Sequence, residues 1–319
     1  MNTLAEIRAR LAAQENKQSN NFDKTSYQFW NMETGKTAVV RFLPDGDSSN
    51  DFFWIEKLSI KLPFAGIKGT SETKQVTVTV PCVEMFPKAE YPSGCPILAQ
   101  VRGWYKDVSM TEQANKYWKK RSYILQGFVR DNPIADDVAN APENPIRRFV
   151  LNTQLFNTIK SALLNPDMEH LPTEYVSGTD FRITKTLKGV YADYSTSGYA
   201  RKDTALTENE LAAIEKYGLA NLADSLPKKP TALELKVLEE MFEASVNGEQ
   251  YDPTRWAAYY KPFGYNDSND ASGKTEKSEN PAAPEVKAET PKEEPKLQVK
   301  ANGGSKAAEI LAAIQNRNK

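Results

Sequence analysis

The residues best suited to chemistry in this chain are aromatic rings set beside cations. Tyr117, Trp118 and Tyr123 flank the basic run Lys119–Arg121, and the stretch 116–130 holds five cations and no Asp or Glu. Unpaired bases stack on flat rings while Lys and Arg neutralise the phosphates, so this pattern is typical of a single-stranded nucleic-acid site. The alternative is that the rings belong to the core and the cations to a solvated turn, because aromatic side chains are often buried.

Charge is strongly segregated along the chain, although the formal net charge of the 319 residues is only -1. Residues 182–202 carry five cations and one acid, whereas residues 203–252 carry eleven acids and four cations. A protein without a basic net charge must gather its cations on one surface to bind nucleic acid. The sequence therefore predicts a basic face and a separate acidic segment.

Catalytic motifs are missing from the sequence. His170 is the single histidine, which excludes a multi-histidine metal centre, and neither an acyl-transfer elbow nor a glycine-rich nucleotide loop is present. Gly35-Lys36-Thr37 resembles the end of a phosphate-binding loop, but Trp30 stands where the motif's first glycine belongs. We therefore predict a protein that is not an enzyme.

Zinc is the only metal for which the sequence offers candidate ligands, and these are Cys82 and Cys95. Two thiolates make half of a tetrahedral set, and the pair is spaced too widely for a CxxC knuckle. The sequence favours two structural thiols and no cofactor. Two cysteines in a chain of this length also indicate a reducing compartment rather than a disulfide framework.

Hydrophobic periodicity predicts an α+β chain. A helix is expected at 153–164, and two more begin at capping boxes, Thr207 with Glu210 and Thr231 with Glu234. A loop carrying two rings, Tyr191 and Tyr194, is expected at 189–194. Strands are expected at 36–44, 52–62, 74–80, 147–151 and 180–188, the last with a cationic face.

Both ends of the chain are expected to lie outside the main fold. Residues 1–24 form an arm with a short amphipathic helix, which we expect to dock on a neighbouring copy of the chain. Residues 266–305 lack aromatics and are rich in Pro, Glu, Lys and Ala, a composition that predicts a disordered linker. Residues 306–319 form an amphipathic helix suited to partner binding. The candidate self-association residues in the arm are Arg8, Arg10 and Lys17.

Neither a signal peptide nor an apolar run of membrane-spanning length is apparent, so no membrane association is expected.

Collinear motifs between about residues 30 and 265 resemble the single-stranded DNA-binding (helix-destabilising) protein of T-even-type phages. The order of the motifs is the specific part of this resemblance. The matching segments are Ala38–Pro44, Ser93–Pro96, Lys119–Tyr123, Ala141–Asn144 and the paired rings Tyr191 and Tyr194.

The resemblance implies a fold and a function. The core, residues 25–265, would be an OB-fold β-barrel with helical insertions and an acidic helical segment. It would coat single-stranded DNA cooperatively during phage replication, recombination and repair, in the cytoplasm of the infected bacterial host. The tail would recruit replication and recombination proteins.

Site residues follow partly from the resemblance and partly from composition. The family's basic and aromatic cleft corresponds to Lys119, Lys120, Arg121 and Tyr123, and further to Trp104 or Tyr105, Tyr117, Tyr191 and Tyr194. Residue type and charge add Trp118, Arg130, Arg147, Arg148, Lys185 and Lys188. The family's zinc site transfers badly, since Leu98 stands where a third cysteine belongs, and the resemblance implies that zinc is lost.

Two alternatives stay open. An RNA-binding regulator would carry the same rings and cations, because discrimination of the 2′-hydroxyl is not visible in a sequence. A non-nucleic-acid structural or adaptor protein would instead use the acidic helices and the tail to bind other proteins.

Overall fold

The computed structural model describes residues 25–70 and 74–265, so the predicted arm, linker and C-terminal helix lie outside the described residues. The described chain forms two compact units. The first takes residues 25–60 together with Pro81–Leu98 and Trp118–Pro230, and the second takes Lys61–Val80 without 71–73, Ala99–Tyr117 and residues 231–265. Each unit is described by itself below.

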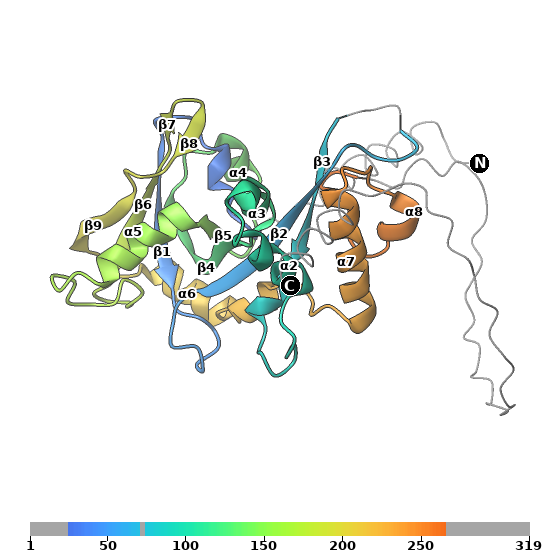
Figure 1. Ribbon diagram of the computed structural model, residues 1–319. Coiled ribbons are helices and arrows are strands. Elements are labelled where there is room, and N and C mark those ends of the chain that lie inside the picture. The colour runs from blue at the N-terminus through green and yellow to red at the C-terminus, as the bar shows by residue number, and fades with distance from the viewer. Residues whose placement is uncertain (1–24, 71–73, 266–319) are drawn as a thin grey trace, which may run out of the picture. The chain divides into compact units, whose positions relative to one another are not determined.

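An antiparallel sheet organises the first unit (Figure 1). The strand order is β3-β2-β4-β1-β6-β9, and β5 pairs with the other edge of β4. Strands β2 and β3 continue across the boundary between the units. The strands are β1 (Thr37–Leu43), β2 (Ile55–Phe64), β3 (Val76–Pro81), β4 (Lys120–Asp131), β5 (Arg147–Asn152), β6 (Thr179–Thr184) and β9 (Gly198–Asp203).

The long strand β4 joins the sheet together. Its first half pairs with β2 and its second half with β1 along one edge, while β5 runs along its other edge. At Gly127 the backbone of β1 approaches so closely that a Cβ atom would lie 2.1 Å from the carbonyl oxygen of Arg41. Only glycine fits this crossing.

The pairings leave the sheet open. Within the described residues β5 pairs with β4 and, through a single bridge at Arg148, with Ser26, whereas β9 pairs only with β6, so no closed barrel forms. Helix α5 (Thr153–Leu163) contacts both β5 and β9. Asn152 caps α5, because its side chain accepts a hydrogen bond from the Leu155 N–H at 2.9 Å. The predicted α+β class is confirmed at this level.

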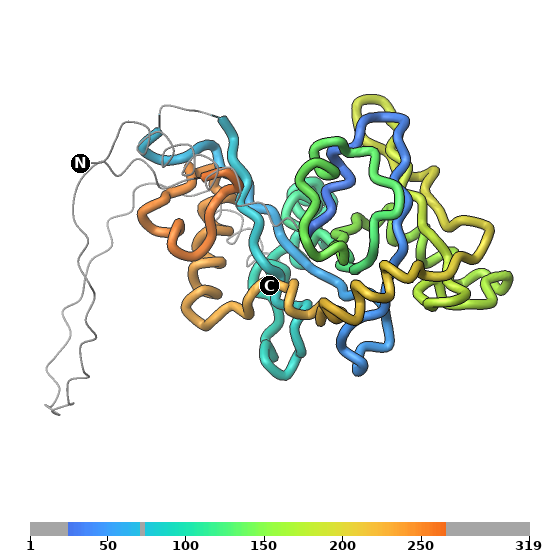
Figure 2. The backbone as a smooth tube through the Cα atoms, turned by 180° about the vertical axis from the view of Figure 1, so that it is seen from behind, coloured from blue at the N-terminus to red at the C-terminus, as the bar shows by residue number. Residues whose placement is uncertain are grey.

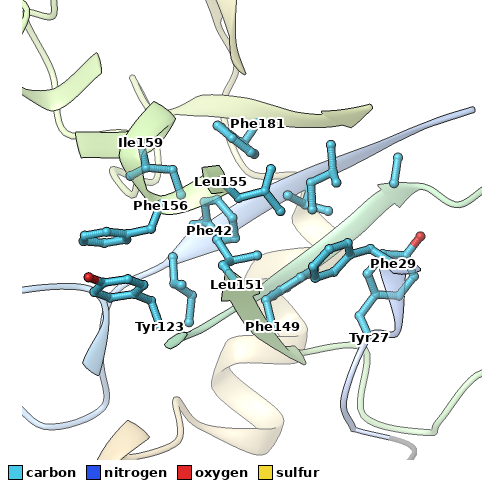
Figure 3. Packing of buried hydrophobic residues seen from close by; sticks show 14 of the residues in the cluster. Tyr27, Phe29, Phe42, Tyr123, Phe149, Leu151, Leu155, Phe156, Ile159 and Phe181 are labelled. Carbon is cyan, nitrogen blue, oxygen red and sulfur yellow. The ribbon is translucent and has the colours of Figure 1, made fainter. Parts of the chain in front are cut away.

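The core of the first unit lies between the sheet and α5 (Figure 3). Alternate residues of each strand point into it, as the pleat requires. The rings of Phe42 and Phe149 meet edge to face with centroids 5.5 Å apart, and Phe181 lies 5.6 Å from Phe42. Tyr27 and Phe29 close the core from the start of the described chain.

The opposite face of the sheet is partly covered by α6 (Glu208–Tyr217) and the short helix η4 (Leu222–Ser225). The predicted capping box at Thr207 and Glu210 is present. A second apolar cluster under this cover unites Leu43, Phe128, Ile146, Leu206 and Ala213. Figure 2 follows the same segment along the outside of the strands.

The second unit is mainly helical, and Phe64, Phe242 and Trp256 are buried in it. The capping box of α7 at Thr231 and Glu234 is present as predicted. Its helices are α3 (Thr111–Tyr117), α7 (Ala232–Val246), α8 (Pro253–Trp256), η3 (Val108–Met110) and the last part of α2 (Pro96–Trp104), which begins in the first unit.

One predicted strand is divided. The segment 180–188 forms β6 and then, after Lys185, the first strand of a separate hairpin. The predicted loop 189–194 is therefore the turn and second strand of that hairpin. The remaining elements are β7 (Thr186–Lys188), β8 (Tyr191–Asp193), α4 (Ala135–Ala139), η1 (Phe29–Asn31) and η2 (Val83–Met85).

Across residues 25–70 and 74–265, no helix combines the length and the apolar character needed to cross a bilayer.

Replacing Gly127 by Ala is expected to destabilise the protein by about 3 kcal/mol, because a methyl group has no room against β1. Gly103 in α2 is a matched control, since nothing lies within 4 Å of the position that a Cβ atom would take there, and its φ is not in the left-handed region. Gly103→Ala should stabilise by about 0.5–1 kcal/mol. Urea unfolding of both variants measures this, and equal effects would contradict the close approach at Gly127.

Candidate nucleic-acid interface

The predicted aromatic-basic stretch does not form one surface. The chain passes from the second unit to the first between Tyr117 and Trp118. In the second unit Trp104 and Tyr117 are buried against Phe242, with ring centroids 5.6 and 5.3 Å from it. The expectation that these two rings contact DNA is wrong, because they build the core of their unit. Tyr105 is exposed.

Two rings expected at the surface of the first unit are buried as well. Tyr123 is 8% exposed and stacks on Phe156 with centroids 3.5 Å apart (Figure 3). Tyr194 is 4% exposed and meets the edge of Phe29. The prediction that both rings are partly exposed is wrong. Tyr123 alternates with Ser122 along β4 and falls on the core side.

Arg130 is a structural residue and not a surface cation. Its Nε and Nη2 donate to the two carboxylate oxygens of Glu210 at 2.9 and 2.7 Å. Its Nη1 donates to Asp180 at 2.8 Å and to the Thr204 hydroxyl at 3.0 Å. One guanidinium thereby joins β4 to β6, to the segment after β9 and to α6. The expected DNA contact of Arg130 is replaced by this clamp.

Asp180 is shared with a second arginine. Arg41 is fully buried, and its Nη1 lies 3.5 Å from the Asp180 carboxylate. No side-chain nitrogen of Arg41 has a hydrogen-bond partner within the described residues. Burial lowers the pKa of Arg41, and the neighbouring charge of Arg130 lowers it further.

Arg147 also serves the fold. It is 5% exposed and donates to both carboxylate oxygens of Asp137 at 2.7 and 2.9 Å. Its guanidinium lies 5.6 Å from the ring centroid of Tyr27. A side chain so buried, with both terminal nitrogens bound to Asp137, does not meet a strand from solvent, and its predicted contact with DNA is wrong.

The basic run is divided between two sides of the sheet. Lys119 pairs with Glu84 at 2.7 Å, and the exposed Arg121 pairs with Glu56 at 3.2 Å. Trp118 is half-buried, with the Lys119 ammonium 5.9 Å from its ring. Lys120 is exposed and points to the other side of β4 from Arg121.

Lys120 belongs to a surface on β2, β4 and β5, which we call the basic sheet face. The registers align Ser59 with Lys120, Lys57 with Ser122, and Gln126 with Arg148, so these side chains share one side of the sheet. Among the described residues, none of the paired positions on this side of the three strands holds Asp or Glu. The members of the face are Lys57, Ser59, Lys120, Ser122, Arg148 and Asn152.

Like charges are crowded on this face. The pKa of Lys57 is lowered, first by its partial burial and then by the nearby Arg148 charge. Arg148 in turn donates to the hydroxyls of Ser225 and Thr25, at 2.9 and 2.8 Å, which fixes its guanidinium. A phosphate bound beside these cations would favour their charged forms.

The hairpin of β7 and β8 places predicted site residues together. Lys188 lies opposite Tyr191 beside the turn at Gly189, whose φ of 65° suits glycine. Tyr191 is 77% exposed, and the neighbouring Leu187 and Val190 are exposed too. The hairpin presents one large ring and one cation to solvent.

Lys185 holds the start of the hairpin. Its ammonium donates to the carbonyl oxygens of Trp30 and Met32, each at 2.6 Å. Trp30 is 45% exposed, so a second accessible ring lies at this position. Lys185 therefore positions Trp30 at the base of the hairpin rather than standing alone as a phosphate ligand.

The hairpin base and the basic sheet face lie at the same end of β5. Asn152 is the last residue of β5 and faces outward on the basic side. Two residues further on, the Gln154 side chain accepts from the Tyr194 N–H at 3.0 Å and donates to Asp193 at 2.5 Å. The first turn of α5 thus connects the two surfaces.

Sequence reasoning missed Lys57 and Trp30. Lys57 stands in the alternating segment 52–62 with no other cation within three positions, so only pairing with β4 brings it to Lys120. A signal for Trp30 was present in the run Tyr27–Trp30, where three rings occur in four residues. Burial of Tyr27 and Phe29 leaves Trp30 as the accessible one.

The two thiols do not form a zinc site with the described residues. Cys82 and Cys95 are buried and hydrogen-bonded to each other, and the Cys95 sulfur also accepts from backbone N–H groups of Val83, Ile97 and Leu98. No group of three or more His, Cys, Asp or Glu side chains suited to a metal occurs in the described ranges. The hydrogen bond from Cys82 is the main cause that lowers the pKa of Cys95 to about 7. The predicted lack of zinc stays a prediction.

No protein-family model matches this chain, and no curated protein matches it.

Glu210→Gln tests the Arg130 clamp. Burial alone would raise the pKa of Glu210, but hydrogen bonds from Arg130 and Thr207 outweigh burial and hold that pKa below its ordinary 4.5. A lowered folded-state pKa stabilises the protein fully above the unfolded-state value, and this contribution is lost as the pH falls through the folded-state value. The variant should lose about 2 kcal/mol at neutral pH.

Urea unfolding from pH 7 down to pH 3 measures this linkage. Below about pH 4.5 the stability of the wild-type protein should fall more steeply than that of Glu210→Gln, so that the two curves converge. Curves that stay parallel over the whole range would show that the Glu210 carboxylate is not linked to folding.

Tyr194→Ala and Tyr191→Ala form a matched pair three residues apart. Removing the buried ring of Tyr194 should cost about 3 kcal/mol of folding stability. Removing the exposed ring of Tyr191 should change the stability by less than about 0.5 kcal/mol. Thermal and urea unfolding compare them, and a large loss for Tyr191→Ala would mean that its ring is packed.

Proposed function

We propose that this protein binds and coats single-stranded DNA without catalysing a reaction. The observation that carries the proposal is the basic sheet face, where the strand registers bring the cations Lys57, Lys120 and Arg148 to one side of the sheet. Phosphates of an unpaired strand neutralise these cations. Bases stack on accessible rings at the neighbouring hairpin, of which Tyr191 and Trp30 are the most suitable.

The strand order supports an OB-fold origin for this unit. In an OB-fold the first strand pairs with the second and fourth, the third extends the second, and the fifth extends the fourth, with a helix after the third. Here β1 pairs with β4 and β6, β5 pairs with β4, and β9 pairs with β6. Strands β1, β4, β5, β6 and β9 therefore correspond to the first to fifth strands of an OB-fold, and α5 follows β5 as the helix after the third strand. The gap between β5 and β9 corresponds to a partly open barrel.

The position of the proposed site agrees with that fold. OB-folds bind oligonucleotides on the face of their second and third strands and with the loops after the first and fourth. In this protein the second and third strands are β4 and β5. The connection after the first strand, between β1 and β4, contains Lys57, and the connection after the fourth strand, between β6 and β9, contains the β7–β8 hairpin. The resemblance to the helix-destabilising proteins of T-even-type phages points the same way. With it we propose a role in phage DNA replication, recombination and repair in the host cytoplasm.

Fluorescence anisotropy with oligo(dT) at two salt concentrations tests the proposal. Affinity should fall steeply with salt, because each neutralised phosphate on a single strand contributes about 0.7 to the slope of log K against log salt. Oligo(rU) in parallel separates a DNA-binding protein from an RNA-binding regulator. A protein that binds neither at low salt would instead be a structural or adaptor protein.

Two variants assign the site. Lys120→Ala should lower the salt slope by about 0.7, and Tyr191→Ala should weaken binding by about 1–3 kcal/mol with the slope unchanged. Lys88→Ala is the control, because Lys88 is an exposed cation outside the basic sheet face. Binding by all three variants equal to the wild type would remove this surface from the interface.

Self-association through residues 1–24 and recruitment of replication and recombination proteins through residues 266–319 remain part of the proposal. Both segments lie outside the described residues.

A further inference from the structure

A second basic surface lies on strands β1, β6 and β9, and the proposed site does not use it. Two adjoining hollows of about 570 and 550 Å³ share Val39, Arg182 and Tyr199 as lining residues. Arg201 and Lys202 line one of them as well. We call the exposed cations of this surface, Arg182, Arg201 and Lys202, the second basic face.

These three cations are not engaged by the fold. Within the described residues none of them forms an ion pair, in contrast to Arg130, Arg147 and Lys119. Exposed arginines without a carboxylate partner keep their forked donors available, and this geometry matches a phosphate in two parallel hydrogen bonds.

The acid that lines the hollows is already neutralised. Asp180 accepts from Arg130 at 2.8 Å and lies 3.5 Å from the buried Arg41. Arg41 and Arg130 therefore face two carboxylates, Asp180 and Glu210, and Asp180 is held within this group of balanced charges. At the margins, Asp203 accepts a hydrogen bond from Thr179, and Asp131 lies opposite Val39 in the β1–β4 ladder.

Hydroxyl groups complete the lining. Thr184, Thr196 and Thr37 line the first hollow, and Thr204 lines the second. Hydroxyls and guanidinium groups are the side chains that commonly contact sugar and phosphate without reading a base. This composition suits an extended polyanion backbone better than a small apolar ligand.

The basic sheet face and Arg182 of the second basic face lie on the same side of one sheet. Arg148 and Arg182 lie on the side away from the main core, as do their strand partners Gln126 and Val39. The cover of α6 and η4 lies on this side as well, packed on Leu43 and Phe128. Arg130 holds this cover in place through its hydrogen bonds to Glu210. The fold itself therefore decides which part of this side of the sheet is covered and which part stays open.

We propose that the second basic face holds a further stretch of the same DNA strand that occupies the basic sheet face. This inference rests on the proposed function and extends it, because it adds a second contact region on one protein. Contacts there go to the phosphates, so the face adds affinity and length of covered strand without base preference.

The test compares the wild-type full chain with Arg182→Ala/Arg201→Ala/Lys202→Ala. On poly(dT) the variant should cover fewer nucleotides per protein, and its salt slope should fall by roughly 2, which is about 0.7 for each cation lost. Affinity for an oligo(dT) of about 8 nucleotides, long enough for one face only, should stay within about twofold.

Two controls separate this role from a general loss of charge or structure. Lys88→Ala/Lys160→Ala/Lys228→Ala removes three exposed cations that line neither hollow, and it should keep the wild-type slope and covered length. Arg182→Lys/Arg201→Lys keeps the charge and should keep most of the slope. Thermal unfolding should be the same for all three variants, because the replaced side chains are exposed.

Three results would overturn the inference. They are an unchanged covered length and slope in the triple variant, an equal loss in the matched control, and an equal loss of affinity for the short oligonucleotide. Failure of the proposed function itself is distinguishable, because the wild-type protein would then not bind poly(dT) at all.

Discussion

The bidentate pair between Arg130 and Glu210 is the interaction on which the arrangement of the first unit depends. Arg130 reaches from β4 to α6 and also bonds to Asp180 on β6, so three elements distant in sequence meet at one guanidinium. Partly buried charges are costly unless each has a partner, and here each has at least one. The clamp holds the α6 cover on the sheet, and the cover decides which parts of the outer surface remain open.

Ion pairs with carboxylates hold several cations of this protein in structural roles. Arg147 is engaged by Asp137, and Lys119 is engaged by Glu84. On the basic sheet face the strand registers bring Lys57, Lys120 and Arg148 together, and the Arg148 charge contributes, after burial, to the lowered pKa of Lys57. A cluster of cations favours binding of an anion, and perturbed pKa values of this kind recur at functional sites.

Local signals in the sequence predicted several elements well. The capping boxes at Thr207 and Thr231 are present, and α5 begins and ends close to the expected positions. The strand at 147–151 is present as well. In each case the signal is a hydrogen bond or a periodicity within a few residues, so no distant part of the chain is needed to specify it.

The site was predicted less well because ring exposure depends on strand pairing. Tyr123 and Lys120 stand three residues apart in β4, yet one lies in the core and the other on the basic sheet face. Lys57, 63 positions before Lys120 in the sequence, reaches the same face through pairing of β2 with β4. No composition or spacing within the stretch 116–130 distinguishes these outcomes.

The sequence by itself determined the α+β class, the helix starts and the concentration of cations in two stretches of the chain. Only the tertiary structure decided which of those cations face a carboxylate and which face solvent. The physical reason is the two-residue period of a β-strand, because a shift of one position exchanges the core side for the solvent side. Which side is the core is set by the elements that pack against it, here α5 on one side and α6 on the other.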